Sequence, residues 1–240
     1  MKVLVVGASR GTGAAVVAEL ARRGHLVTAF ARSAGRDGQG HEEVRYVAGD
    51  VLDPDELRKA MVGQDAVAVT LGIPDNPFRV RLTRRASSPL DIRSRGTRAV
   101  IDAMIEHGVP RLVVQSTYGI GETYAQLPIS LKLFFTLAIR PQVKDQERQE
   151  QLVRESSLAW TIVRPVLLND EPTTSPAHVG MDDRVPTMSV SRRQVAEVTA
   201  DELESGERAG RVLSVSAPAM RSRSTSATRS SRRPHGDQRA

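Results

Sequence analysis

A glycine-rich turn near the start of the chain carries residues that could hold a phosphate group. Residues 7–13 read GASRGTG; they follow the apolar run Val3 to Val6 and lead directly into a helical pattern. Glycine permits positive φ and a close approach of backbone N–H groups. A helix that starts near Thr12 directs its positive end at an anion. A strand, glycines and a helix in this order predict a nucleotide-binding turn, although glycines alone would also suit an ordinary turn.

The spacing of the turn predicts which residues approach the ligand. It is Gly7-x-x-x-Gly11-x-Gly13 rather than G-x-G-x-x-G, with Gly13 placed so that the helix can pack tightly on the first strand. The pyrophosphate of a dinucleotide is the expected ligand. The contacts expected here come from the turn itself: Gly7, Ser9, Arg10, Gly11, Thr12 and Gly13.

The end of the second expected strand indicates which dinucleotide is bound. Sites for NAD usually place an acidic residue there to hold the ribose 2′-hydroxyl. This strand ends Phe30-Ala31-Arg32-Ser33 and has no acid. Arg32, together with Arg10, could clamp a 2′-phosphate through charged hydrogen bonds. We therefore expect NADP(H) to be preferred over NAD(H); the alternative is that both arginines are merely solvated.

The positions that follow the next two strands extend this site. Asp50 and Val51 follow the third strand and are expected to meet the adenine. Leu71 and Gly72 follow the fourth and are expected beside the ribose and pyrophosphate.

These positions depend on an alternation of strands and helices. Strands are expected at 2–6, 26–31, 44–48, 66–70, 111–115, 159–163 and 211–215, and helices at 12–23, 54–62, 96–107, 143–156 and 191–205. Nearly continuous Val, Ile and Leu strands that alternate with helices predict an α/β fold, a doubly wound parallel sheet with helices on both faces. Three stretches are expected to be irregular: 33–43, 73–95 and 119–140. The last two follow strands that end near the ligand, so they are candidate substrate lids.

Composition limits the class of protein. The chain has 240 residues, no cysteine and a net charge of +6. Of that charge, +5 lies in residues 219–240, which have six arginines, one acid and little apolar content. We expect a folded domain over 1–218 and a basic, solvated tail. No leader and no membrane span are expected, so the expected location is cytoplasmic. Neither nucleic acid nor membrane is an expected partner.

Several motifs resemble those of a known family. GASRGTG, Arg32, the run GDVLD at 49–53, the strand LVVQST at 112–117 and the stretch VRESSLAWTIVRP at 153–165 are similar to atypical short-chain dehydrogenase/reductases. The nearest pattern is the NAD(P)H-binding group that includes biliverdin-IXβ reductase/flavin reductase and NmrA-like proteins. The resemblance covers about residues 1–217 and implies a Rossmann sheet with the nicotinamide at the carboxyl ends of the strands. It places Ser116 and Thr117 beside the nicotinamide, and Pro165, Val166 and Leu167 against its face and carboxamide.

The catalytic residues are less well defined. Short-chain dehydrogenases pair Tyr and Lys as Y-x-x-x-K to protonate a carbonyl as hydride arrives. That pair is absent here, and the related position on the long helix holds Gln146. Ser116 is the expected polar contact to the reacting end, although it could simply orient the cofactor. Tyr118 and Tyr124 are speculative acids that could equally belong to lid packing.

Two further features bear on the substrate. The stretch from Arg79 to Arg95 is the most basic part of the body and could attract an anionic substrate or simply be solvated. Phe134 and Phe135 could form an apolar lid, a packing contact or a dimer face. The five histidines have no metal-ligand spacing, so no metal is expected.

The favoured hypothesis is an NADPH-dependent oxidoreductase acting on a small planar or carbonyl-bearing substrate, including anionic ones, such as a flavin, quinone, enone or tetrapyrrole. The alternatives are a non-catalytic NADP(H)-sensing protein and an isomerase or epimerase that retains its cofactor. A monomer or homodimer is expected.

Overall fold

The structure is a computed structural model that describes residues 1–33, 42–72, 88–137 and 139–219. Most of the expected lid at 73–95, with the arginines at 79, 81, 84 and 85, lies outside these ranges. So does the expected tail from residue 220 onward.

A central sheet organises the described residues. Its strands are β1 (Lys2–Val6), β2 (Leu26–Ala31), β3 (Val44–Ala48), β4 (Ala66–Val69), β5 (Arg111–Gln115), β6 (Ala159–Pro165), β8 (His178–Gly180) and β10 (Arg211–Ser216). Their order is β3-β2-β1-β4-β5-β6-β10-β8, and β8 alone among these pairs is antiparallel to its neighbour. The first six positions follow the order of dinucleotide-binding sheets, in which the direction of winding reverses between β1 and β4.

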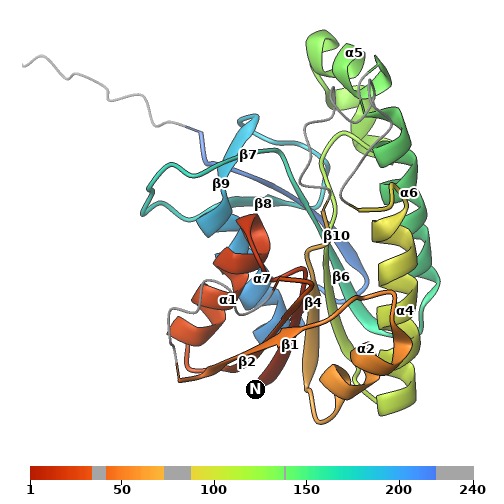
Figure 1. Cartoon of the computed structure of the whole chain (residues 1–240). Helices are drawn as coiled ribbons and strands as arrows, with labels where there is room; N and C mark the ends of the chain where they lie inside the picture. Colours follow the sequence, from red (N-terminus) through yellow and green to blue (C-terminus); the bar gives the residue numbers. More distant parts are fainter. Residues whose placement is uncertain (34–41, 73–87, 138, 220–240) are drawn as a thin grey trace, which may run out of the picture.

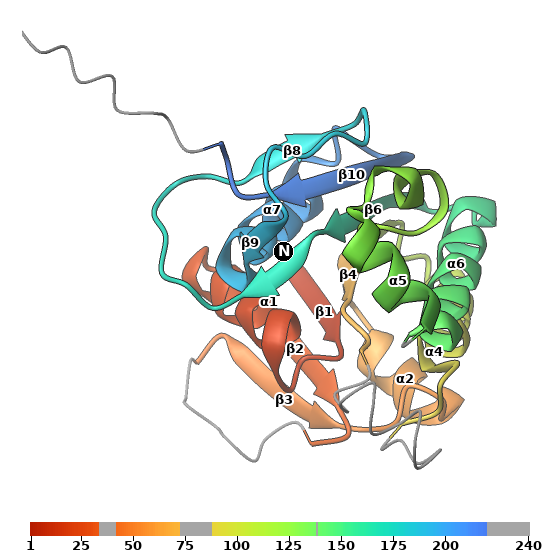
Figure 2. The same cartoon turned by 90° about the horizontal axis from the view of Figure 1, so that it is seen from above.

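Helices cover both faces of the sheet (Figures 1 and 2). Helices α1 (Gly11–Arg22) and α7 (Arg192–Ser205) pack on one face, and α2 (Pro54–Met61), α4 (Ile92–His107) and α6 (Arg140–Glu155) on the other. Strand β1 shows why both faces are covered. Its side chains alternate between the two cores, with Val3 and Val5 toward α1 and α7, and Leu4 and Val6 toward the other helices. The doubly wound α/β fold class is confirmed.

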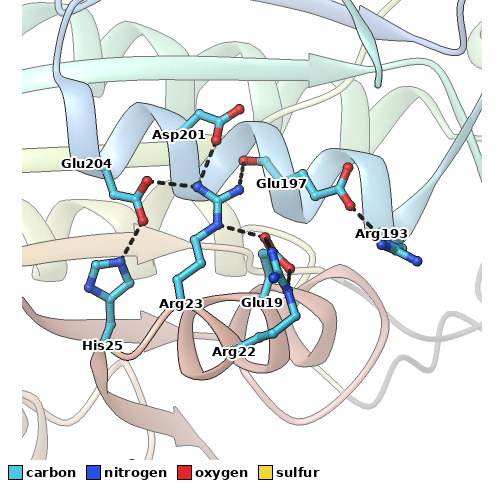
Figure 3. Close-up of polar contacts among 8 residues, drawn as sticks. All are labelled: Glu19, Arg22, Arg23, His25, Arg193, Glu197, Asp201 and Glu204. Atoms are coloured by element: carbon cyan, nitrogen blue, oxygen red, sulfur yellow. Dashed lines mark hydrogen bonds and ion pairs between the residues drawn. The ribbon is translucent and has the colours of Figure 1, made fainter. Parts of the chain in front are cut away.

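Charged side chains join α1 to α7 (Figure 3). Glu19 of α1 is buried and accepts hydrogen bonds from Arg22 and Arg23. Arg23, which ends the helix, reaches across to Asp201 at 2.7 Å and Glu204 at 2.8 Å, both on α7. Glu204 also contacts His25. This cluster lies apart from the carboxyl ends of the strands and is a structural connection between the two helices.

The structure corrects one expectation about the segment 119–140, which is not irregular. It contains a short 3₁₀ helix η1 (Gly121–Gln126) and helix α5 (Ile129–Leu137), and Phe135 is buried. The expected helices at 96–107 and 143–156 begin earlier, at Ile92 and Arg140; Asp91 stands at the N-cap of the first and Pro141 in the first turn of the second. Two three-residue strands, β7 (Leu167–Asn169) and β9 (Ser189–Ser191), pair outside the main sheet and escaped prediction because they are so short.

Candidate cofactor and substrate site

One cleft opens at the carboxyl ends of the strands. It has a volume of about 740 Å³, within the range of small-molecule sites. Its described lining comes from the glycine-rich turn, the ends of β2 to β5, and helices α4, α6 and α7: Val6, Gly7, Ser9, Arg10, Gly11, Thr12, Phe30, Ala31, Arg32, Ser33, Gly49, Asp50, Val51, Thr70, Leu71, Gly72, Ser88, Ile92, Arg93, Gln115, Ser116, Gln146, Leu168 and Arg192. Most positions that were predicted to contact a cofactor therefore lie in one cleft.

The turn itself leaves no room for side chains at two of its glycines. Gly7 has φ of +91°, and a Cβ there would lie 2.8 Å from the carbonyl oxygen of Thr70. A Cβ on Gly13 would lie 2.2 Å from the carbonyl oxygen of Gly7. Gly13 does not line the cleft; it lets α1 start against β1, as the spacing predicted. The turn is thus held close to β4, which leaves its outer side facing the cleft.

Among the described residues, no side chain accepts a hydrogen bond from the N-terminus of α1. Its N-cap residue is Arg10, whose side chain makes no capping hydrogen bond. The starts of the helices α2, α4 and α7, by contrast, have partners in Asp53, Asp145 and Ser191. The first N–H groups of a helix have no acceptor within the helix and favour an anion. Since Gly11 and Thr12 line the cleft, a phosphate there fits these donors.

The described lining is strongly cationic. Four arginines face the cleft, Arg10, Arg32, Arg93 and Arg192, against one carboxylate, Asp50. Arg32 follows β2 at the position predicted to distinguish the two dinucleotides, and its Nη2 donates to the Ser88 hydroxyl at 2.6 Å. This balance of charge fits an anionic ligand with several phosphates.

The cleft also contains polar atoms without hydrogen-bond partners among the described residues. They are Nη1 of Arg93, Oε1 of Gln115 and Oγ of Ser116, all buried. A buried polar atom left unpaired costs about 1–3 kcal/mol, and such atoms often mark functional sites. Burial also lowers the pKa of Arg93, which the nearby Asp145 opposes. Gln146 lines the same cleft. Of these four residues, Ser116 was expected to contact the ligand, and Arg93 belongs to the basic stretch that could attract an anionic substrate. The sequence did not indicate Gln115 or Gln146 as contacts, because burial without a partner is invisible in a sequence.

Several predicted residues lie outside the described lining. Thr117 is half-buried beside Ser116 but does not line the cleft, and neither do Pro165 and Val166, which are buried. Leu167 is 51% exposed, and its neighbour Leu168 lines the cleft instead. In the three-residue strand β7, successive side chains alternate, so a shift of one position exchanges inside for outside.

The two tyrosines proposed as acids also lie away from the lining. Tyr118 is buried, and its hydroxyl donates to the carbonyl oxygen of Asp183 at 2.8 Å. Burial raises the pKa of Tyr118, and Asp183 raises it further. Tyr124 is exposed on η1, with its hydroxyl 3.0 Å from Oγ1 of Thr136 on α5. In this structure the Tyr124 hydroxyl is engaged within the lid segment, whereas the Tyr118 hydroxyl is bound to the backbone at Asp183, outside it.

Comparison with known proteins identifies the family. Residues 7–206 match the family model described as NAD(P)H-binding. The chain belongs to this NAD(P)H-binding family. An uncharacterized chloroplastic protein of Arabidopsis thaliana is 28% identical over 228 residues, which cover 91% of this chain and 77% of that protein.

Solved structures agree with the family assignment. A Rossmann-fold NAD(P)-binding protein from Shigella flexneri is 27% identical with a TM-score of 0.68, over 90% of this chain and 93% of that one. A short-chain dehydrogenase/reductase from Veillonella parvula, solved with NADP, has 18% identity and a TM-score of 0.74, over 90% and 94%. The anaerobillin reductase of Escherichia coli O157:H7 is 20% identical with a TM-score of 0.70, over 92% of this chain and 99% of that one. The predicted NAD(P)H-binding family is confirmed, and the fold is the Rossmann fold of NAD(P)-binding proteins.

No helix within the described ranges is long and apolar enough to cross a membrane. No group of three or more His, Asp or Glu side chains in the same ranges is arranged to hold a metal ion.

Proposed function

We propose that this member of the NAD(P)H-binding family is an NADPH-dependent reductase of the atypical short-chain dehydrogenase/reductase type. Its acceptor is small and planar or carbonyl-bearing, and can be anionic, such as a flavin, quinone, enone or tetrapyrrole. The observation that carries the proposal is the group of unpaired buried polar atoms on Arg93, Gln115 and Ser116 in this cleft, because Gln115 and Ser116 lie at the end of β5, two strands beyond β1 on the side away from β2 and Arg32.

The near end of the cleft supports NADP(H) as the preferred cofactor. The uncapped start of α1 and the glycine-rich turn would bind the pyrophosphate. Arg32 and Arg10 would pair with the 2′-phosphate, and no acid stands at the end of β2 to favour a free 2′-hydroxyl. Asp50 and Val51 would meet the adenine, with Leu71 and Gly72 along the ribose. When bound, NADPH supplies the hydride.

At the far end, the chain's own residues would orient and polarise the acceptor. Ser116 can donate its hydroxyl proton to an oxygen of the substrate, and Arg93 supplies a fixed cation for charge that develops there. Gln115 offers an acceptor to an N–H group. Thr117 and the segment Pro165 to Leu167 remain proposed contacts of the nicotinamide. Of these, Val166 is buried, so its contribution would be to support the segment from below.

The proton that accompanies hydride transfer would come from solvent through Ser116. No Tyr, Lys or His lines the cleft within the described ranges. Flavins, quinones and conjugated tetrapyrroles spread the developing charge, so a cation and a hydroxyl can replace a strong acid. Catalytic roles for Tyr118 and Tyr124 stay predictions that would require their present hydrogen bonds to break.

One structural neighbour bears on the substrate class, because it is described as an anaerobillin reductase. This supports a tetrapyrrole among the acceptors to be tried. The cytoplasmic location remains a proposal, because the Arabidopsis relative is described as chloroplastic.

The test measures NADPH oxidation by the purified chain with FMN, a quinone, an enone and a linear tetrapyrrole carrying carboxylates. We expect turnover with at least one of them. The variant Arg93→Gln should keep its affinity for NADPH and lose at least about tenfold in kcat/KM. Arg95→Gln is the matched control, because Arg95 is exposed on the same helix and pairs with Asp91.

Three outcomes would contradict the proposal. Tight binding of NADP(H) without turnover of any acceptor would favour a sensing role, which is also consistent with the absence of the Tyr–Lys pair. Interconversion of a substrate without net NADPH consumption would indicate an isomerase or epimerase. Equal kcat/KM in Arg93→Gln and wild type would remove Arg93 from the reaction.

A further inference from the structure

Arg192, from helix α7, brings a second cation to the glycine-rich turn, in addition to Arg10. It is the first residue of α7 and lines the cleft with 29% of its side chain exposed. The next residue, Arg193, does not line the cleft; it is 61% exposed and pairs with Glu197 on its own helix. Two consecutive arginines therefore have different surroundings, and only the first faces the site.

The position of Arg192 relative to the turn is close. A Cβ built on Gly11 would meet Nε of Arg192 at 3.6 Å, which is ordinary van der Waals contact. Gly11 is also the first residue of α1, whose opening N–H groups have no side-chain acceptor in the described part of the chain. An anion bound to these N–H groups would therefore lie within reach of the Arg192 guanidinium.

Arg192 already has a carboxylate partner. Its Nη1 donates to Oδ2 of Asp170 at 2.7 Å. Asp170 directly follows strand β7 and is 80% exposed. An ion pair with so exposed a carboxylate contributes little, because water screens it. Hydrogen bonds from Arg to a phosphate are stronger and can be bidentate. A phosphate at the turn would compete with Asp170 for the guanidinium on favourable terms.

We infer that Arg192 is a ligand of the cofactor pyrophosphate and that Asp170 is the built-in competitor that limits its affinity. This inference rests on the proposed function, since it takes a dinucleotide as the ligand. It assigns a regulatory contact to the connection after β7, because any change that removes the Asp170 carboxylate from Arg192 makes the cofactor bind more tightly.

The test compares dissociation constants for NADPH and NADH in the full chain, with the variants Arg192→Ala, Arg193→Ala and Asp170→Asn. We expect Arg192→Ala to raise the dissociation constants of both dinucleotides by the same factor, about tenfold or more, because both contain the pyrophosphate. Arg193→Ala should stay within twofold of wild type. Asp170→Asn should lower both dissociation constants by about two- to fivefold. Thermal unfolding of each variant checks that it is folded.

The outcomes separate the alternatives. A loss confined to NADPH would mean that Arg192 contacts the 2′-phosphate, which overturns the pyrophosphate assignment. Values for Arg192→Ala within twofold of wild type would remove Arg192 from binding. Weaker binding by Asp170→Asn would show that Asp170 positions Arg192 rather than competes. In each case wild-type binding leaves the proposed function standing, whereas a wild-type chain that binds neither dinucleotide overturns both.

Discussion

Arg32 is the residue on which the choice of cofactor depends. Its side chain lines the cleft directly after β2 and is held by the Ser88 hydroxyl. A hydroxyl is a neutral partner that a phosphate oxygen can replace or join, so this contact is compatible with phosphate binding. Asp50, the acid in the described lining, follows β3 rather than β2.

The variant Arg32→Asp should reverse the preference between the two dinucleotides. It removes a charged hydrogen bond worth about 1.5–3 kcal/mol and places a carboxylate where a 2′-hydroxyl would bind. We expect NADPH affinity to fall by about ten- to a hundredfold, with NADH affinity unchanged or improved. Fluorescence titration measures both constants.

Arg98→Asp makes the same charge change at an exposed position of α4 outside the cleft lining, and so controls for net charge. If both variants weaken NADPH binding equally, the effect comes from the net charge of the whole chain and Arg32 makes no specific contact. A wild type that binds NADH as tightly as NADPH would refute the expected preference directly.

At the scale of elements, the connection between α1 and α7 holds the turn in place. Helix α1 begins at the turn and α7 begins at Arg192, so their relative position sets the width of this part of the cleft. The cluster in Figure 3 fixes the far ends of both helices through Glu19, Arg23 and Glu204. Its loss should therefore affect stability before it affects the chemistry.

Glu19 gives this cluster a defined dependence on pH. The hydrogen bond from Arg22 lowers the pKa of Glu19 most, burial opposes it and Arg23 lowers it further, to about 2 from 4.5. Because the folded-state pKa is below the unfolded value, the stabilisation is complete above pH 4.5 and is lost as the pH falls toward 2. It amounts to roughly 1–3 kcal/mol.

We therefore expect the variant Glu19→Gln to be less stable than wild type at pH 7 and to approach it as the pH falls below 4.5. Urea unfolding at several pH values measures the difference. Glu155→Gln is a suitable control, because Glu155 is exposed and contacts only Gln151 among the described residues. A difference between Glu19→Gln and wild type that stays constant from pH 7 to pH 3 would mean that the Glu19 charge does not contribute.

The elements also show what a sequence can predict. The strands β2, β3 and β5 have the predicted bounds, because β-rich apolar runs between turn residues mark them clearly. Helix α5 was missed because its apolar residues do not mark one buried face. Ile129, Leu133 and Leu137, for example, are apolar but exposed. Arg93 and Arg192 begin helices next to the cleft, and their part in the lining depends on how α4 and α7 pack.

Over the whole molecule, positive charge has two separate sources. The described cleft contains four arginines and one carboxylate. Residues 219–240 carry +5 of the net +6. Charges far from the ligand are screened over about 10 Å at 0.1 M salt, whereas charges in contact with it are screened less. The two sources can therefore be distinguished by the ionic strength dependence of binding.

We expect NADPH affinity to fall as ionic strength rises from 0.02 to about 0.5 M, and to fall more steeply than NADH affinity, because the 2′-phosphate adds charge that pairs with Arg32 and Arg10. A chain that ends at residue 218 should show the same affinities and the same slopes as the full chain. Titrations of both chains at four salt concentrations measure this. If truncation flattened the slope for NADPH, the basic tail would be the source of the attraction, and the cleft arginines would not account for the preference. If instead the slopes for NADPH and NADH were equal in both chains, the 2′-phosphate would lie in solvent and Arg32 would have another role. Unequal slopes that persist after truncation would require the additional charge of NADPH to be bound within residues 1–218.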